Sequence, residues 1–376
     1  MASQDHRVVI TGVGVVSPFG RGLDALWQAL LRGDTAVRQR DGEPPAARVE
    51  AYSPPANLDA DAASRLGRCA LLATDAAIQA IEDARLPVTA QSAPLIGVSF
   101  GSDHGEGDSA AAGDLATSVA RVLGVAGPVI SHRGPVSGAS AIAEAAELIR
   151  RGAAPVVVAG GADFLSAAGL AHTPSHLSLA RAVARPFDRE SDGAAPGEGA
   201  AAFVLEDEAL ARERGARVYA ELLGQGTAFS RATVMAPAMN SVDAARAMQA
   251  ALFRAEILQG EIDLVSDSAA GDSVGDAVSA KALRELWGPN VDRLTVTSVH
   301  GGIGHASSAA APLALAATLR ALVEGLVPPT VGCREVDPAF SDLDIVLGEP
   351  RRLRFATALV NAFSAGSNVS LILRRA

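Results

Sequence analysis

The chain has 376 residues, a formal net charge of −10 and 49% hydrophobic residues. This length and composition predict a globular protein with a large core, long enough to hold two fused halves. The acidic balance, with a sequence pI near 5.2, argues against nucleic acid and anionic membranes as partners, because both require clustered cations on the protein surface.

The first predicted element is an apolar strand at residues 8–16, which follows a short polar start. This start has no basic region or cleavage site, and no apolar run in the chain reaches membrane-spanning length. We therefore expect no leader peptide and no membrane segment. The strand contains Gly12-x-Gly14 but lacks the third glycine and the directly following helix of a dinucleotide site, so we expect no cofactor.

The next predicted elements alternate between Ala-rich helices and apolar strands. In the first part they are helices at 23–31 and 66–81 and strands at 95–100, 156–159 and 201–205. A second series follows, with strands at 218–223, 262–266 and 294–299, helices at 242–255 and 308–322, and strands near 345 and 358. The second series roughly repeats the first and predicts an α/β protein with a largely buried sheet.

The two cysteines predict no special chemistry. Cys69 lies in the second helical pattern and Cys333 in a late loop, and neither has a metal-ligand companion at close spacing. We expect no metal site, no disulfide framework and inert thiols, which fits a reducing cytoplasmic location.

The segment 127–149 is predicted to form a short buried strand, a tight turn and a helix, whose apolar residues from Ile142 to Ile149 recur at helical spacing. Pro135 lies in the turn, at the N-terminal end of the helix, where nucleophiles and oxyanions are favoured. Proline has no side-chain heteroatom and no backbone N–H. It can neither attack an acyl thioester nor donate to an oxyanion.

Several stretches resemble motifs of the β-ketoacyl synthases, a family with the thiolase fold. They are Val8-Val-Ile-Thr-Gly-Val-Gly, the turn and helix around Ser137-Gly138, Arg185-Pro-Phe-Asp with Gly197-Glu-Gly-Ala, the run from Ile262 to Asp276, Thr297-Ser-Val-His with Gly304-His305, and Asn361-Ala-Phe363. The resemblance spans nearly the whole chain. It implies a thiolase-like α/β fold of two pseudo-duplicated βα halves, at residues 1–225 and 226–376, in a layered α-β-α-β-α arrangement.

The same resemblance assigns the catalytic positions of the family to residues with different chemistry. Pro135 falls on the nucleophilic cysteine, Ser268 on the first histidine and His300 on the lysine, and His305 alone matches, on the second histidine. A serine hydroxyl cannot exchange protons near pH 7 as an imidazole does. We therefore expect no intact catalytic set. His305 is expected to be a structural histidine, or else to bond a carbonyl or pantetheine group.

Four other motif positions are expected to be structural. Glu198, in a Gly-rich turn before a strand, should be a buried carboxylate that accepts backbone N–H bonds. Asp276 matches the last aspartate of the motif that contains Ser268. Asn361 and Phe363 begin a loop that resembles the glycine-rich gate of active synthases, but it is shorter and has fewer glycines, so we expect it to be stiffer.

The chain keeps the family's other motifs while its catalytic positions are altered. In this combination it resembles the chain-length factors, the ketosynthase β-subunits of type II polyketide systems. The resemblance implies an obligate heterodimer with a paralogous catalytic ketosynthase, and an acyl carrier protein that binds mainly through that partner. We expect the interface around 129–136 and 156–165. The candidates for the interface and the tunnel that sets chain length are Phe100, Asp103, His104, Ile130, His132 and Arg133.

Two alternatives remain open. The chain could be an altered synthase-fold acyltransferase or malonyl-carrier-protein decarboxylase that uses His305, and turnover by the isolated chain would indicate this. It could instead be a scaffold that only stabilises its partner or recruits a carrier protein. In that case, substitutions in the tunnel would leave product length unchanged.

Overall fold

The structure is a computed structural model that describes residues 6–56, 58–103, 114–166, 178–229, 240–364 and 366–376. The long strands of the first half are β1 (Val8–Ser17), β5 (Ile96–Ser102), β6 (Val129–Arg133), β7 (Val156–Asp163) and β8 (Gly199–Asp207). Its helices are α1 (Leu23–Leu31), α2 (Ala60–Arg65), α3 (Arg68–Ala84), α4 (Leu115–Leu123), α5 (Ser137–Arg150) and α7 (Glu208–Glu213).

The second half has strands β9 (Ala220–Phe229), β10 (Leu264–Ser266), β11 (Thr295–Thr297), β15 (Thr357–Phe363) and β16 (Ser367–Arg375). Its helices are α8 (Ser241–Ala255), α9 (Ser273–Trp287), α10 (His300–Ile303) and α11 (Ala310–Glu324). The described residues also form six short strands: β2 (Gly20–Arg21), β3 (Val37–Arg38), β4 (Ala46–Ala47), β12 (Leu326–Val327), β13 (Asp344–Ile345) and β14 (Arg351–Arg352). The predicted strands and helices are all present, with ends shifted by a few residues, and the helices α2, α4, α7, α9 and α10 are additional.

The two halves of the sheet have the same strand order. The first reads β6-β5-β7-β8-β1 and the second β11-β10-β15-β16-β9, within one 12-stranded sheet. In each half the first two pairings are parallel and the next two antiparallel. The halves join where Val9 and Ile10 of β1 pair with β9. The expected boundary at residue 225 lies inside β9, which the strand order places in the second half.

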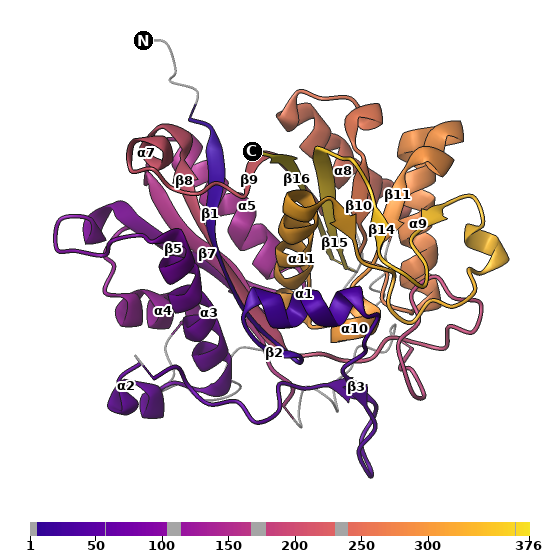
Figure 1. The fold of residues 1–376 in the computed structure, drawn as a ribbon, viewed down its shortest axis with the longest axis horizontal. Helices are drawn as coiled ribbons and strands as arrows, with labels where there is room; N and C mark the ends of the chain where they lie inside the picture. The colour runs from indigo at the N-terminus through magenta and orange to yellow at the C-terminus, as the bar shows by residue number, and fades with distance from the viewer. Residues whose placement is uncertain (1–5, 57, 104–113, 167–177, 230–239, 365) are drawn as a thin grey trace.

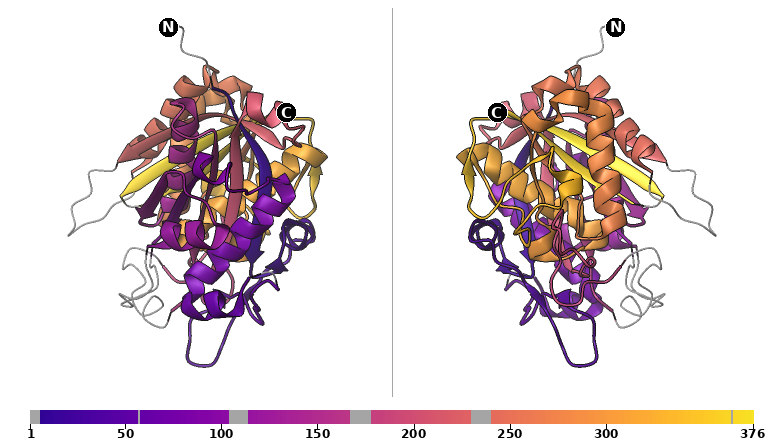
Figure 2. Two further views of the ribbon diagram at one scale, coloured as in Figure 1. Left: turned by 90° about the vertical axis from the view of Figure 1, so that its left-hand side faces the viewer. Right: turned by 90° about the vertical axis from the view of Figure 1, so that its right-hand side faces the viewer.

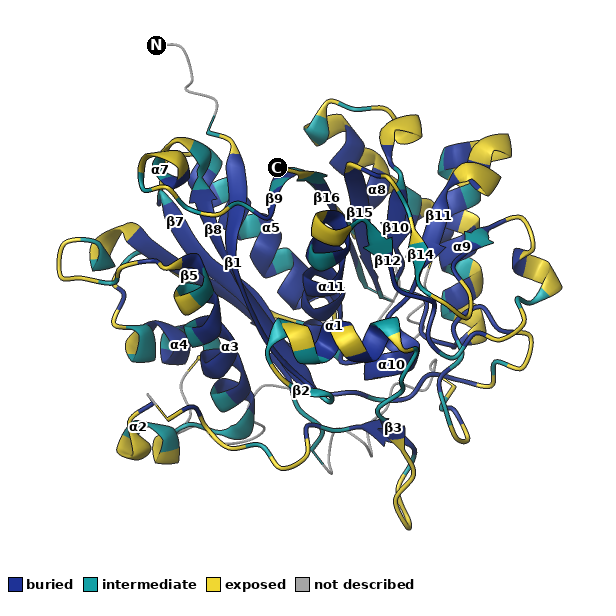
Figure 3. Ribbon diagram, in the orientation of Figure 1, coloured by how far each residue is buried: buried dark blue, intermediate teal, exposed yellow. Residues whose placement is uncertain are grey.

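The helices form three layers around the two half-sheets (Figure 1). In the middle, α5 packs on β5 and β7, and α11 packs on β15 and against α5. The outer layers are α3 and α4 on the first half and α8 and α9 on the second, seen from their own sides in Figure 2. Burial follows this arrangement, since α5 and α11 are mostly buried and α8 and α9 expose one face (Figure 3). The α-β-α-β-α layering that the family resemblance implies is therefore present.

Glycines of the first strand allow α3 to approach the sheet closely. A Cβ atom at Gly14 would lie 1.9 Å from the Ala76 carbonyl oxygen, and one at Gly12 would lie 2.1 Å from that of Ala80. The Gly12-x-Gly14 motif therefore serves strand–helix packing. No helix among the residues that the structure describes combines the length and hydropathy needed to cross a membrane.

The strand β6 is the outermost strand of the first half, and this corrects the prediction that it is buried. It pairs only with β5 among the described strands, and Val129, Ser131 and Arg133 are exposed. The strand β7 differs from its predicted role in the opposite way. It lies between β5 and β8 and is buried throughout, so its backbone cannot pair with a partner subunit. Of the interface predicted at 156–165, only the partly exposed end around Phe164 and Leu165 reaches the surface.

Candidate functional site

The turn before α5 is built around a proline. Gly134 adopts a φ of 119°, a conformation that favours glycine, and its carbonyl oxygen accepts the backbone N–H of Ser137 at 3.1 Å. Pro135 lies between them and is exposed, two residues before the helix begins. Because its side chain has no heteroatom, the N-terminus of α5 presents no nucleophile at this position.

The N-termini of the two central helices meet beside this turn. The hydroxyls of Ser137 and Ser308 lie 2.7 Å apart and both residues are buried, Ser308 in the 3-10 turn that leads into α11. Gly138 permits the contact, because a Cβ atom there would lie 2.1 Å from the Ser308 carbonyl oxygen. Each hydroxyl has the other as its partner, whereas a nucleophilic serine needs an adjacent base.

A buried carboxylate, Asp163, connects this junction to the end of β5. It accepts the backbone N–H groups of Ser308 at 2.9 Å and of Asp103 at 3.1 Å. The Asp103 carboxylate in turn accepts the Ser307 hydroxyl at 2.7 Å. The structure thus brings the candidate Asp103 to the site. Sequence reasoning missed Asp163, whose only signal is its position at the end of a buried apolar strand.

The two histidines lie together in the segment before α11, with ring centroids 6.1 Å apart. His300 is buried, and burial together with the neighbouring His305 lowers its pKa to about 3. Its Nδ1 has no hydrogen-bond partner among the described residues. Burial also lowers the pKa of His305, although nearby Asp103, Asp163 and Asp272 oppose the shift. Both imidazoles are therefore neutral near pH 7, and His300 cannot replace the positive charge of a lysine.

Ser268 follows β10 and is partly exposed, between two buried carboxylates that organise its loop. Burial raises the pKa of Asp267, against the hydrogen bonds donated by the Ser279 hydroxyl and the Ala269 N–H. Burial likewise raises the pKa of Asp276 to about 7. The Asp276 carboxylate accepts three backbone N–H bonds, from Phe187, Ala270 and Gly271. This supports the expectation that Asp276 is structural.

Glu198 is the buried carboxylate that the sequence predicts. Its Oε1 accepts the Val49 N–H at 2.7 Å and the Arg68 guanidinium at 2.7 Å, and its Oε2 accepts the Leu165 N–H at 3.0 Å. These bonds connect three loops at one end of the sheet. A paired, fully bonded carboxylate of this kind holds structure and has no free position for a substrate.

Asn361 and Phe363 lie in β15, and the loop expected to resemble a gate is the tight connection from β15 to β16. Phe363 pairs with Asn368 at the end of the hairpin, and the Ser364 hydroxyl bonds to the Ser367 carbonyl oxygen at 3.0 Å. The Asn361 side chain accepts the Ser370 hydroxyl at 2.8 Å and is buried. The described part of this connection is therefore tied to the sheet.

The remaining interface and tunnel candidates differ in how far they are buried. Phe100 is fully buried beneath α3 and α4, in the core of this chain, which corrects its assignment to an interface surface. Ile130 and His132 are partly buried on β6, and the His132 Nε2 lies 3.1 Å from the Ser99 hydroxyl. Burial lowers the pKa of His132, with Glu144 opposing. Arg133 is exposed at the end of β6. His104 lies outside the described residues.

Comparison with known proteins places this site in a family. Residues 5–211 match the N-terminal domain of β-ketoacyl synthases, and residues 219–334 match the C-terminal domain. The chain belongs to the β-ketoacyl synthase family. It is 29% identical over 415 residues to 3-oxoacyl-[acyl-carrier-protein] synthase 2 of Staphylococcus aureus (strain COL), covering 99% of both chains. The synthase of the same name from Synechocystis sp. is 28% identical over 417 residues, with the same coverage.

Solved structures of β-ketoacyl synthases are similar over the whole chain. The ishigamide ketosynthase/chain length factor has a TM-score of 0.89 at 28% identity, covering 99% of this chain and 100% of that one. A β-ketoacyl synthase from Burkholderia phymatum STM815 gives the same values. The complex AntDE:AntF, at 24% identity and a TM-score of 0.86, shares the fold. This β-ketoacyl synthase-family chain thus keeps the family frame around a turn that carries Pro135.

Proposed function

We propose that this member of the β-ketoacyl synthase family is a non-catalytic ketosynthase subunit of the chain-length factor type. It would pair with a paralogous catalytic ketosynthase and shape the tunnel in which the polyketide chain grows. The observation that carries this proposal is Pro135, which leaves the position of the family's nucleophile, in the turn before the central helix α5, without an acyl-accepting atom.

The residues at two other family positions, Ser268 and His300, support the same conclusion. A ketosynthase needs proton donors around the thioester carbonyl of its substrate, in addition to a nucleophile. Here His300 is neutral and buried, and Ser268 stands where the family has a histidine. Cys333 does not replace the missing nucleophile, because burial, with Asp188 and Asp276 nearby, raises the pKa of its thiol to about 12.

The outer strand β6 supports pairing with a second subunit. Val129 is 40% exposed, and the strand carries a backbone edge without a neighbour among the described strands. Such an edge is a template for pairing with another chain. Since β6 leads directly into the turn at Pro135, a partner docked there would lie next to the site.

Names of similar structures agree with this assignment. One is a ketosynthase/chain length factor, and another is a type II acyl-carrier protein in complex with its ketosynthase. We infer that an acyl carrier protein reaches the proposed heterodimer mainly through the catalytic partner. The chain itself would contribute the far wall of the tunnel.

A larger side chain at position 103 tests whether this chain shapes the tunnel that sets product length. Asp103→Trp, with the catalytic partner supplied, is expected to shift the product mixture toward shorter chains. The residue lies between the end of β5 and the turn that leads into α11, where we place the tunnel, and added bulk would shorten it. Asp103→Asn removes the charge without adding bulk and is expected to leave the length distribution unchanged. Chromatography with mass detection of the products measures both. Equal product lengths in an intact Asp103→Trp complex would contradict the tunnel role and favour a scaffold.

A further inference from the structure

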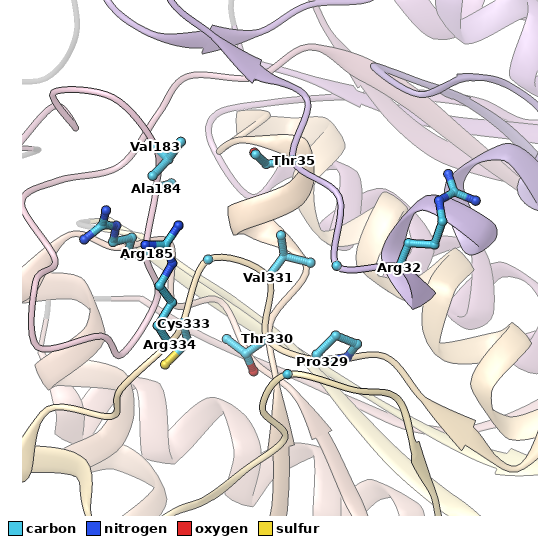
Figure 4. Close-up of a pocket in the computed structure, with 13 residues that line it drawn as sticks. Arg32, Thr35, Val183, Ala184, Arg185, Pro329, Thr330, Val331, Cys333 and Arg334 are labelled. Atoms are coloured by element: carbon cyan, nitrogen blue, oxygen red, sulfur yellow. The ribbon is translucent and has the colours of Figure 1, made fainter.

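A cavity of about 260 Å³ lies apart from the turn at Pro135 (Figure 4). Four segments line it: residues 32–35 after α1, residues 183–185, residues 329–334 after β12, and Gly348. Neither Pro135 nor Ser268 nor His305 lines it. The cavity is therefore a separate feature of the chain, on the small side for a ligand pocket.

All the charged residues that line this cavity are arginines: Arg32, Arg185 and Arg334. This is unusual in a chain with a net charge of −10. Figure 4 shows the side chains of Arg185 and Arg334 on the same side of the cavity, on two segments that pack together at Gly332, whereas that of Arg32 is directed away. Two guanidinium groups on one wall repel each other, and an anion bound between them would relieve that repulsion.

Few carboxylates of the protein compete with a ligand for these two arginines. Arg185 pairs with Glu190, whose side chain is 68% exposed and outside the lining, and such a rim pair contributes little in water. Arg334 forms no ion pair with any residue that the structure describes. The neighbouring Glu335 pairs with Arg189 instead. Guanidinium groups bind phosphate and carboxylate oxygens through paired hydrogen bonds.

The backbone around the two arginines is held in place by a buried carboxylate. Asp188 accepts the backbone N–H of Arg334 at 2.6 Å and that of Glu335 at 2.9 Å. Gly332 packs so closely that a Cβ atom there would lie 2.3 Å from the Ala184 carbonyl oxygen. The wall is thus preorganised, which lowers the entropic cost of binding.

The rest of the lining includes three apolar side chains among threonines and glycines. Pro329 and Val331 are buried and Val183 is partly buried, and all three contribute to the cavity. A ligand that fits must combine an anionic group with a short apolar body. Two adjacent guanidinium groups are better neutralised by a doubly charged phosphoryl group than by a single carboxylate.

We propose that this cavity binds a small phosphorylated molecule, with the phosphoryl group on Arg185 and Arg334 and a short apolar body against Val183, Pro329 and Val331. The site is independent of the proposed tunnel role. It adds a ligand-binding function to a chain whose synthase positions are altered.

Phenyl phosphate is a suitable probe, because it has both the charge and the apolar body. Isothermal titration at low salt, with the full chain alone or in its complex, is expected to give saturable binding. Arg334→Gln and Arg185→Gln in this chain are each expected to weaken binding by about tenfold or more, since each removes charge-assisted hydrogen bonds. Arg354→Gln, at an exposed arginine outside the lining, is the matched control and should bind as the unaltered chain does.

Benzoate tests the charge requirement, since it has the same ring with a single carboxylate. It is expected to bind more weakly than phenyl phosphate. The proposal is overturned if phenyl phosphate gives no saturable binding, if both arginine variants bind it as tightly as the control, or if benzoate binds equally well. Because Arg334 is exposed, the Arg334→Gln variant should fold. Its binding can therefore be compared with the control even if Arg185→Gln does not fold.

Discussion

Replacing Val129 with aspartate is expected to abolish polyketide formation by the proposed heterodimer, because the two subunits should no longer associate. Val129 is 40% exposed on the edge strand β6, and strand pairing across the interface would bury it. A charge left unpaired in an interface costs on the order of 3 kcal/mol, which is about a hundredfold in Kd. Size-exclusion chromatography of the co-expressed subunits measures association, and product yield measures the consequence.

The matched control for this substitution is Phe253→Asp. Phe253 is 87% exposed on α8, in the outer layer of the other half, so the same charge there should leave both complex and product unchanged. Neither substitution should alter the stability of the isolated chain by more than about 1 kcal/mol, because both sites are exposed. If Val129→Asp assembles normally while the chain remains folded, β6 is not the interface.

Gly138→Ala is expected to destabilise the chain by about 3 kcal/mol. Its added methyl group would lie 2.1 Å from the Ser308 carbonyl oxygen and 2.7 Å from Pro312 Cγ, so α5 and α11 must move apart. The higher helix propensity of alanine offsets only about 1 kcal/mol of a larger packing cost. Urea unfolding followed by the fluorescence of Trp27 and Trp287, which are buried, measures the change.

Gly260→Ala is the control for this prediction. Gly260 is exposed, has no neighbouring atom within 4 Å of an added Cβ and lies outside the central layer. Its free energy of unfolding should change by less than about 0.5 kcal/mol. Equal stabilities of the two variants would show that the junction of the central helices tolerates separation, contrary to the packing described above.

Much of the fold and part of the site follow from local sequence. The alternation of apolar strands and Ala-rich helices predicts the α/β class, and the incomplete glycine motif Gly12-x-Gly14 argues against a dinucleotide site, in a strand that the structure packs closely on α3. Glu198 is predictable as a buried carboxylate because a charge in a Gly-rich turn before a buried strand must be bonded to backbone N–H groups. The position of Pro135 just before α5 also follows from the sequence.

Other features depend on contacts between distant segments. The composition of β6 does not reveal that it has a neighbour on one side only, so Val129 is predicted as buried and is in fact exposed. Asp163 gains its role from Asp103 and Ser308, which are brought to it by the fold. Arg185 and Arg334 are far apart in sequence and share a cavity only because the loops that carry them are joined through Asp188.

Mass spectrometry of the intact polypeptides during turnover tests the absence of a nucleophile most directly. The chain, in complex with its catalytic partner, is supplied with substrates on acyl carrier protein, quenched in acid and weighed. The proposed function predicts acyl groups on the partner and an unmodified mass for this chain, since Pro135 offers no atom to acylate. An acyl group attached to any residue of this polypeptide at a level comparable to the partner's would contradict it.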